Sequence, residues 1–168
     1  MALITNHLAT EIVSYGFTST QSASAFSIYG IATIIGALAS GAVSAKLSMK
    51  NLLGILYGLR IVGILIYLIL PKTMVVICGY IILLGLTGAA TVTPVSGLSR
   101  WLFGTSGVTI FYGIAFFAHQ VGGFLSAWLG GVCFEQSGGY SWIWMTDAVH
   151  CTAASIISFL ISAQKQNA

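Results

Sequence analysis

Charged side chains are almost missing from this sequence of 168 residues. Only 5% of the residues are Asp, Glu, Lys or Arg, with six basic and three acidic side chains, whereas 57% are hydrophobic. A water-soluble chain of this size needs about a quarter of its residues to be charged. The shortage excludes an ordinary soluble domain and indicates a protein that is solvated by lipid.

Paired cysteines and catalytic motifs are also missing. Cys78, Cys133 and Cys151 are isolated within apolar runs, without the spacing of a zinc site or a redox pair, so we expect buried thiols. No nucleophile with a base, metal-ligand spacing or phosphate-binding loop is visible, and we expect neither an enzyme nor a bound cofactor or metal. The six cations are dispersed, which argues against a nucleic-acid partner.

What the sequence has instead is long apolar stretches. About 20 apolar residues cross a hydrocarbon core, and the lengths of these stretches predict five spans, at about residues 22–45, 52–70, 73–99, 108–134 and 141–162. Runs of this length are typical of helices, because a barrel shows short alternating strands. We therefore expect an all-α membrane protein with about five transmembrane helices.

The two ends of the chain differ from these spans. Residues 1–16 are too short and too polar to cross a membrane alone and predict a partial helix, residues 17–163 the transmembrane bundle, and residues 164–168 a short tail. The start within a helix remnant and the odd number of complete spans favour a truncated membrane protein or a half-size subunit. Glu11 is expected near the outer mouth as a solvated carboxylate.

Basic residues are distributed unequally between alternate loops. One side receives four of them, Lys46, Lys50, Arg100 and Lys165, and the other receives Lys72. The positive-inside rule predicts that the side with four cations, including the C-terminus, is cytoplasmic in a multi-pass protein of the plasma or inner membrane. The same orientation places three aromatic residues at the outer interface: Tyr140, Trp142 and Trp144.

Two residues that are charged at neutral pH fall inside predicted spans and are functional candidates, because a buried charge is costly. Arg60 lies close to the middle of its span. It either attracts an anionic substrate or has a structural role, by pairing within the bundle or by snorkelling to the cytoplasmic face. Asp147 lies within the outer part of the last span and is a conceivable partner for Arg60.

Polar residues in two other spans are further candidates. His119 and Gln120 lie near the middle of the fourth span, and contact with a substrate or proton and plain interhelical hydrogen bonding are both open readings. Pro94 interrupts the third span and frees a backbone carbonyl, which neighbouring threonines or a cavity could satisfy. A kink at Pro94 would help gating.

Small residues are abundant in the fourth span. Gly113, Ala127 and Gly131 fall near one face of an ideal helix, with Gly123 and Gly130 beside it, which predicts a groove for another helix. Gly122 and Gly123 lie in the same span and are candidates for a flexible point. Tight packing and a seam that lets helices rock during transport remain alternative interpretations.

Two stretches carry a resemblance to a known family. Gly41, Lys46 and Lys50 match the cytoplasmic loop signature Gly-x-x-x-Asp-Arg/Lys-x-Gly-x-Arg/Lys of the major facilitator superfamily, whereas Ala45 and Ser48 depart from it. The run 118–135, followed by Ser-Gly-Gly-Tyr at 137–140, resembles helix eleven of that superfamily and the turn into helix twelve. The sequence is similar to the monocarboxylate and oxalate/formate carrier branch.

The resemblance implies a C-terminal half, with the five spans as helices eight to twelve and residues 1–16 as the outer end of helix seven. The fold would resemble the C-terminal six-helix bundle of such a carrier, with a substrate site between two bundles. Span 52–70 would be a peripheral ninth helix, which favours a structural role for Arg60, and span 73–99 the cavity-lining tenth.

The function implied is secondary active transport of a small organic solute, such as a monocarboxylate or a related anion, by alternating access. The partners would be the lipid bilayer, that solute, and an N-terminal half or a second copy of the chain. The alternative is a truncated membrane protein without transport activity, or a half-size subunit that needs a partner half.

Overall fold

The computed structural model describes residues 2–161, and these residues form helices and no strands. In chain order the elements are α1 (Ala2–Ser14), α2 (Ser19–Ser44), α3 (Met49–Ile69), α4 (Met74–Gly88), the 3₁₀ helix η1 (Ala89–Thr91), α5 (Val92–Ser137) and α6 (Ser141–Leu160). The predicted all-α fold is confirmed. The tail with Lys165 lies outside the described residues.

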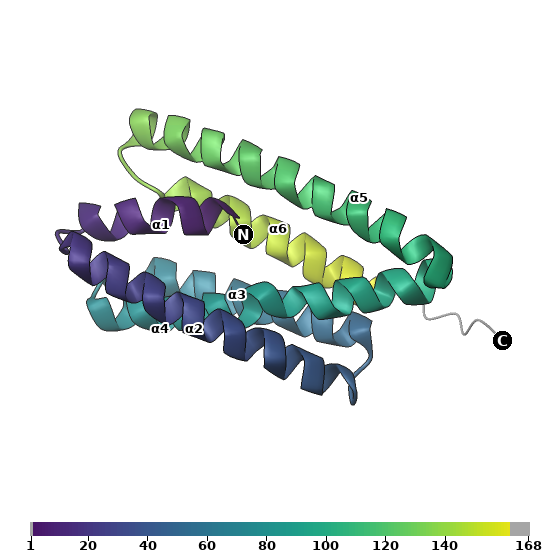
Figure 1. Cartoon of the computed structure of the whole chain (residues 1–168). Coiled ribbons are helices and arrows are strands. Elements are labelled where there is room, and N and C mark those ends of the chain that lie inside the picture. The colour runs from purple at the N-terminus through teal and green to yellow at the C-terminus, as the bar shows by residue number, and fades with distance from the viewer. Residues whose placement is uncertain (1, 162–168) are drawn as a thin grey trace.

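Four helical stretches in the described part of the chain are long and apolar enough to cross a membrane, and the third of them is 63 residues long. This stretch turns back on itself at Gly104, as Figure 1 shows, where φ is 73° and ψ is 179°. Glycine adopts this conformation without the strain that a side chain would add. The sequence suggested a loop of eight residues at 100–107. In the structure these residues are helical except for Gly104, where the chain turns.

The connections alternate between the two ends of the bundle (Figure 1). The α2–α3 loop, the turn at Gly104 and the end of α6 lie at one end, and the other three connections lie at the opposite end. A hydrogen bond supports this arrangement, because Lys50 Nζ donates to the carbonyl oxygen of Ile161 at 3.1 Å. The loop that carries Lys46 therefore lies at the end opposite to the loop that carries Lys72.

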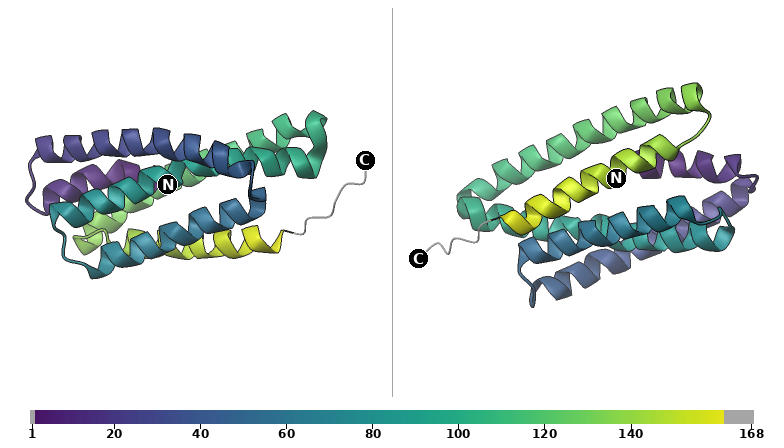
Figure 2. Two further views of the ribbon diagram at one scale, coloured as in Figure 1. Left: turned by 90° about the horizontal axis from the view of Figure 1, so that it is seen from below. Right: turned by 180° about the vertical axis from the view of Figure 1, so that it is seen from behind.

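Two helix pairs form the centre of the bundle, α2 with α4 and α3 with α6. Small residues allow α2 and α4 to approach, because a Cβ atom on Gly36 would overlap the backbone of Leu86, and one on Gly85 would lie 2.7 Å from the Cβ atom of Ala32. Such close approach is how helices associate in lipid. The second half of α5 is more peripheral and runs along one side of the molecule (Figure 2).

The outward surface is apolar along its length. Large hydrophobic side chains are strongly exposed on every long helix, including Leu38 at 72%, Ile69 at 80% and Phe124 at 70%. A soluble monomer does not expose this much apolar surface. The exposed surface and the long apolar helices identify a multi-pass membrane protein.

Two expectations about aromatic and sulfur side chains need correction. Tyr140 and Trp144 are buried in the core, and only Trp142, at 65% exposure, lies on the surface as the interface prediction required. They are buried because the start of α6 packs against the aromatic rings of α3, α4 and α5. Of the cysteines, Cys151 is buried, whereas Cys78 and Cys133 are partly exposed.

Candidate functional site

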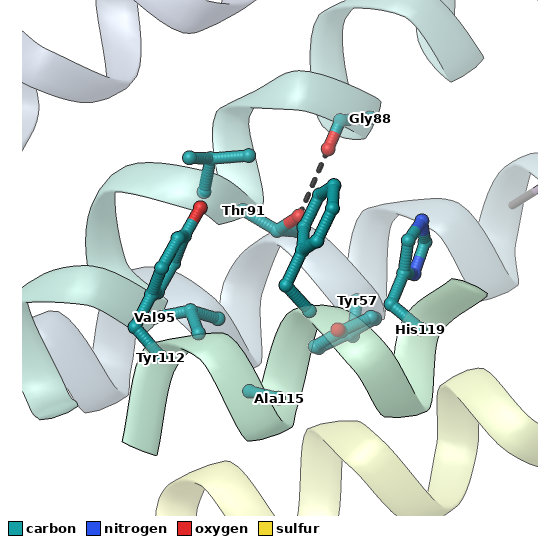
Figure 3. A pocket seen from close by; sticks show the side chains of 9 residues that line it. Tyr57, Gly88, Thr91, Val95, Tyr112, Ala115 and His119 are labelled. Atoms are coloured by element: carbon teal, nitrogen blue, oxygen red, sulfur yellow. Dashed lines mark hydrogen bonds between the residues drawn. The ribbon is translucent and has the colours of Figure 1, made fainter. Parts of the chain in front are cut away.

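A cavity of about 310 Å³ lies between α3, the α4–α5 junction and the second half of α5. Apolar side chains and a few polar groups line it, as is usual for small-molecule sites. The polar groups come from Tyr57 on α3, Thr91 on η1, and Tyr112 and His119 on α5. Figure 3 shows Tyr112 and His119 on the same helix, with Thr91 across the cavity from them.

The α5 side of the cavity follows from helical spacing. Tyr112, Phe116 and His119 are separated by one turn each and therefore share a face of the helix. The rings of Phe116 and His119 have centroids 6.4 Å apart. Gln120 follows directly on the chain but points elsewhere, since it is exposed and is not part of the cavity wall. The structure thus separates two candidates that the sequence had grouped together.

Arg60 lies behind this cavity in the protein interior, with an exposed fraction of 4%. Its Nη2 atom donates to the carbonyl oxygen of Thr87 on α4 at 3.1 Å. Its guanidinium carbon lies 5.7 Å from the centroid of the Tyr57 ring, a cation–π contact. Tyr57 therefore has one face towards Arg60 while its side chain lines the cavity.

Asp147 on α6 is also buried, at 7% exposure. The thiol of Cys151, one turn further on, lies 4.0 Å from Asp147 Oδ2. The charges of Arg60 and Asp147 both act on Tyr57, Tyr80 and Cys151. The two opposite charges thus belong to one buried polar cluster between α3, α4 and α6, which we call the Arg60 cluster.

Pro94 is fully buried in the first turn of α5 and follows the 3₁₀ segment that interrupts the span. Proline has no N–H, so the carbonyl of Ala90 lacks its usual donor. The hydroxyl of Ser40 on α2 donates to this carbonyl at 2.6 Å. The partner of the freed carbonyl is thus a serine from another helix, where the sequence had suggested a neighbouring threonine or a cavity.

Another helix fills only part of the groove that was expected on α5. A Cβ atom on Gly113, Gly122 or Gly131 would meet nothing within 4 Å. The close contact is with Gly130 and Ala127 of the expected set, because the ring of His7 on α1 packs against Gly130 and its Nε2 atom lies 3.0 Å from the carbonyl oxygen of Ala127. Gly122 and Gly123 lie in helical backbone, because the non-helical residue of α5 is Gly104.

The residues of the signature loop lie together at one end of the molecule. Gly41 is exposed near the end of α2, Lys46 lies in the loop, and Lys50 lies in the first turn of α3. Ala45 ends α2, with its N–H donating to the carbonyl of Val43. Lys50 has a structural partner in Ile161, so it ties this loop to the end of α6.

Glu11 is the largest departure from the sequence analysis. Its exposed fraction is 2%, where a solvated carboxylate had been expected. The indole Nε1 of Trp144 donates to its two oxygens at 2.9 and 3.1 Å, and the hydroxyl of Tyr15 donates to Oε1 at 2.7 Å. The expectation failed because the donor that holds this carboxylate, the indole of Trp144 on α6, lies 133 positions away in the sequence.

Sequence reasoning also missed Tyr57 and Tyr112 in the cavity wall. A signal was available for Tyr57, which lies three positions before Arg60 and therefore on the same face of its helix. For Tyr112 the signal was its spacing of seven residues from His119.

Comparison with known proteins places these features in context. Residues 1–167 match the family model described as Major Facilitator Superfamily. Two Bacillus subtilis (strain 168) proteins, each described as an uncharacterized MFS-type transporter, are similar to the chain. YcxA is 31% identical over 147 residues, which is 83% of this chain and 36% of YcxA. YfhI is 25% identical over 147 residues, which is 86% of this chain and 36% of YfhI.

The chain therefore spans about a third of the length of these relatives. No solved structure matches it.

Proposed function

Because the chain belongs to the major facilitator superfamily, we propose that it acts as the C-terminal part of a secondary active transporter, which moves a small organic solute by alternating access. The observation that carries this proposal is the cavity between α3, the α4–α5 junction and α5. It combines apolar walls with the polar groups of Tyr57, Thr91, Tyr112 and His119.

The dimensions and chemistry of the cavity support a small solute. A volume of about 310 Å³ is at the lower end of small-molecule sites. The hydroxyl groups of Tyr57 and Tyr112 and the imidazole of His119 can donate to a carboxylate. The Phe116 and Val95 side chains would cover an apolar part of the same solute.

The position of Arg60 supports an anionic solute, and we favour a monocarboxylate or a related acid. The guanidinium lies directly behind Tyr57 and adds positive potential to the side of the cavity that Tyr57 lines. In this role Arg60 acts through Tyr57 and does not touch the solute. Asp147 balances its charge within the Arg60 cluster.

The proposal also includes the orientation and the partner. The loop with Lys46 and Lys50 faces the cytoplasm of a cell-membrane protein, and the loop with Lys72 faces outside. A second bundle, either an N-terminal half or another copy of this chain, covers the open side of the cavity. Exposed apolar side chains on α2 and α5 are suited to contact with another bundle, with Ile34 at 63% and Phe117 at 69% exposure.

Uptake into vesicles tests the function. Radiolabelled lactate, formate and oxalate are offered to vesicles that contain the chain alone or together with the N-terminal part of YcxA. We expect uptake of at least one of these acids, and we expect His119→Ala to reduce it while Gln120→Ala, next to the cavity but outside it, does not. Absence of uptake in every combination would favour a membrane protein without transport activity.

A further inference from the structure

The carboxylate of Glu11 is held in the protein interior by hydrogen-bond donors from two directions. The indole of Trp144 on α6 and the hydroxyl of Tyr15, which follows α1, both donate to it, at 2.7 to 3.1 Å. Neither the cavity nor the Arg60 cluster includes this group. Because charge-assisted hydrogen bonds are the strong ones, the ionised form of Glu11 fastens α1 to α6.

Other titratable groups face Glu11 from every side of this site. The charge of Lys72 acts on it from the α3–α4 loop, the hydroxyl of Tyr67 faces it from α3, and Tyr80 and Tyr140 sense its charge from α4 and the start of α6. Burial lowers the pKa of Lys72, and the charge of Glu11 partly offsets this effect. Lys72 is only partly buried, so it connects the site with the outer loop.

The groups of α1 and its neighbours complete the surroundings. His7 lies one turn before Glu11 but faces α5, with its Nε2 atom 3.0 Å from the carbonyl oxygen of Ala127. From α2, Ser22 donates to the carbonyl of Ala9 at 3.2 Å and adds no titratable group. Burial and the neighbouring Glu11 carboxylate raise the pKa of Tyr15, which therefore remains a donor at neutral pH.

Two hydroxyl groups next to this site have no hydrogen bond. Tyr67 and Tyr80 are 0% and 5% exposed, and within the described part of the chain neither hydroxyl makes a hydrogen bond of good geometry, although the Tyr67 hydroxyl lies close enough to act on Glu11 and Tyr15. A buried polar group without a partner is costly and needs an explanation. Glu11 can supply a partner to Tyr67 in either form, because the ionised carboxylate can accept from the Tyr67 hydroxyl that faces it and the protonated form can donate to that hydroxyl.

We propose that Glu11 is a proton-binding site, which ties α1 to α6 when it is ionised and loosens this tie when it takes up one proton from water at the outer face. Protonation removes the charge that Trp144 and Tyr15 recognise, and the new O–H group turns to Tyr67. A sodium ion does not suit the site, because the Trp144 N–H donates only and occupies both carboxylate oxygens.

This inference extends the proposed function, since it makes movement of α1 depend on the pH outside the membrane. The test of this inference does not depend on transport, so the inference and the proposed function can fail independently. The decisive observable is the indole of Trp144, which contacts the carboxylate directly.

The test uses the full chain in lipid nanodiscs with Trp144 as the remaining tryptophan. The other three are replaced by phenylalanine (Trp101→Phe, Trp128→Phe and Trp142→Phe), and none of these three is buried. Emission is recorded between about pH 4 and pH 9, a range that brackets ordinary and burial-shifted carboxyl groups. We expect a single titration step that Glu11→Gln abolishes and Glu135→Gln, at an exposed glutamate, leaves unchanged.

Hydrogen exchange of the α1 amides provides a second readout. After correction for intrinsic exchange, the protection of the α1 amides in the chain with Glu11 should fall about tenfold as the pH is lowered through the titration. This is the size expected for weakening a hydrogen bond to a charged group. Glutamine keeps the shape of the side chain, so Glu11→Gln should fold and show no such change. An unchanged titration in Glu11→Gln, or no titration in the parent chain, would overturn the proposal.

Discussion

The hydroxyl group of Ser40 on α2 donates to the carbonyl oxygen of Ala90 at 2.6 Å, and this carbonyl is the one that Pro94 deprives of its usual donor. The interruption of the α4–α5 span is therefore stabilised from another helix. The same segment carries Thr91 and Val95, which line the cavity. The shape of the cavity thus depends on a contact between α2 and the α4–α5 junction.

Ser40→Ala is expected to destabilise the bundle by about 1 kcal/mol, because the buried Ala90 carbonyl loses its donor in a lipid environment. Thermal unfolding in detergent measures this cost. Ser27→Ala is the matched control, since Ser27 is exposed and bonds within its own helix. In a Pro94→Ala background, where a backbone N–H can replace the serine, the cost of Ser40→Ala should be smaller. An equal cost in both backgrounds would contradict this account.

Gly36→Ala should destabilise the protein by about 1–3 kcal/mol, because the added Cβ atom meets the backbone of Leu86 and forces α2 away from α4. Gly30→Ala on the same helix should be neutral or stabilising by up to about 1 kcal/mol, because its Cβ atom meets nothing within 4 Å and alanine favours a helix. Melting temperatures of the two variants check the prediction. Equal effects would show that α2 and α4 do not cross at Gly36.

Arg60→Ala and Asp147→Ala should each lower stability, because each leaves the opposite charge of the Arg60 cluster buried without its counter-charge. Removing both should cost less than the sum of the single losses, by about 1–3 kcal/mol. A double-mutant cycle on denaturant or thermal unfolding measures this difference. Additive effects would mean that the two charges are independent of each other.

Lys46→Cys and Lys72→Cys should react with a membrane-impermeant maleimide from opposite sides of the membrane. The two loops lie at opposite ends of the bundle (Figure 1), and the excess of cations on the Lys46 side predicts that this side faces the cytoplasm. In intact cells only Lys72→Cys should be labelled, and permeabilisation should make Lys46→Cys reactive. Labelling of both positions in intact cells would refute the orientation.

The hydrophobic lengths of the sequence were sufficient for the all-α fold and for the positions of most helices. They could not give the single turn at Gly104, because the helix continues through the polar segment around Arg100 that resembled a loop. Periodicity placed several glycines on one face of α5 but could not say which of them meets a neighbour. The ring of His7 packs on Gly130, a choice that depends on how α1 lies across α5.

In the candidate site, too, the sequence identified single residues but not the contacts between distant helices. Arg60 and His119 stand out in the sequence because polar groups in apolar spans are rare. That Tyr57 lies against Arg60 on one side and lines the cavity on the other depends on the packing of α3, α4 and α5. Glu11 was misjudged for this reason too, since the donor that buries it, Trp144, comes from the last helix.

Protection of a cysteine in the cavity tests most directly that this site binds the solute. Ala115 lines the cavity, whereas Ala118, also exposed on α5, does not. In a chain without native cysteines, Ala115→Cys and Ala118→Cys are modified by a maleimide in nanodiscs, with and without lactate, formate or oxalate. We predict that at least one of these acids slows modification at position 115 in proportion to its occupancy and leaves position 118 unaffected. A modification rate at position 115 that no acid changes, or equal slowing at positions 115 and 118, would contradict a solute site between α3 and α5.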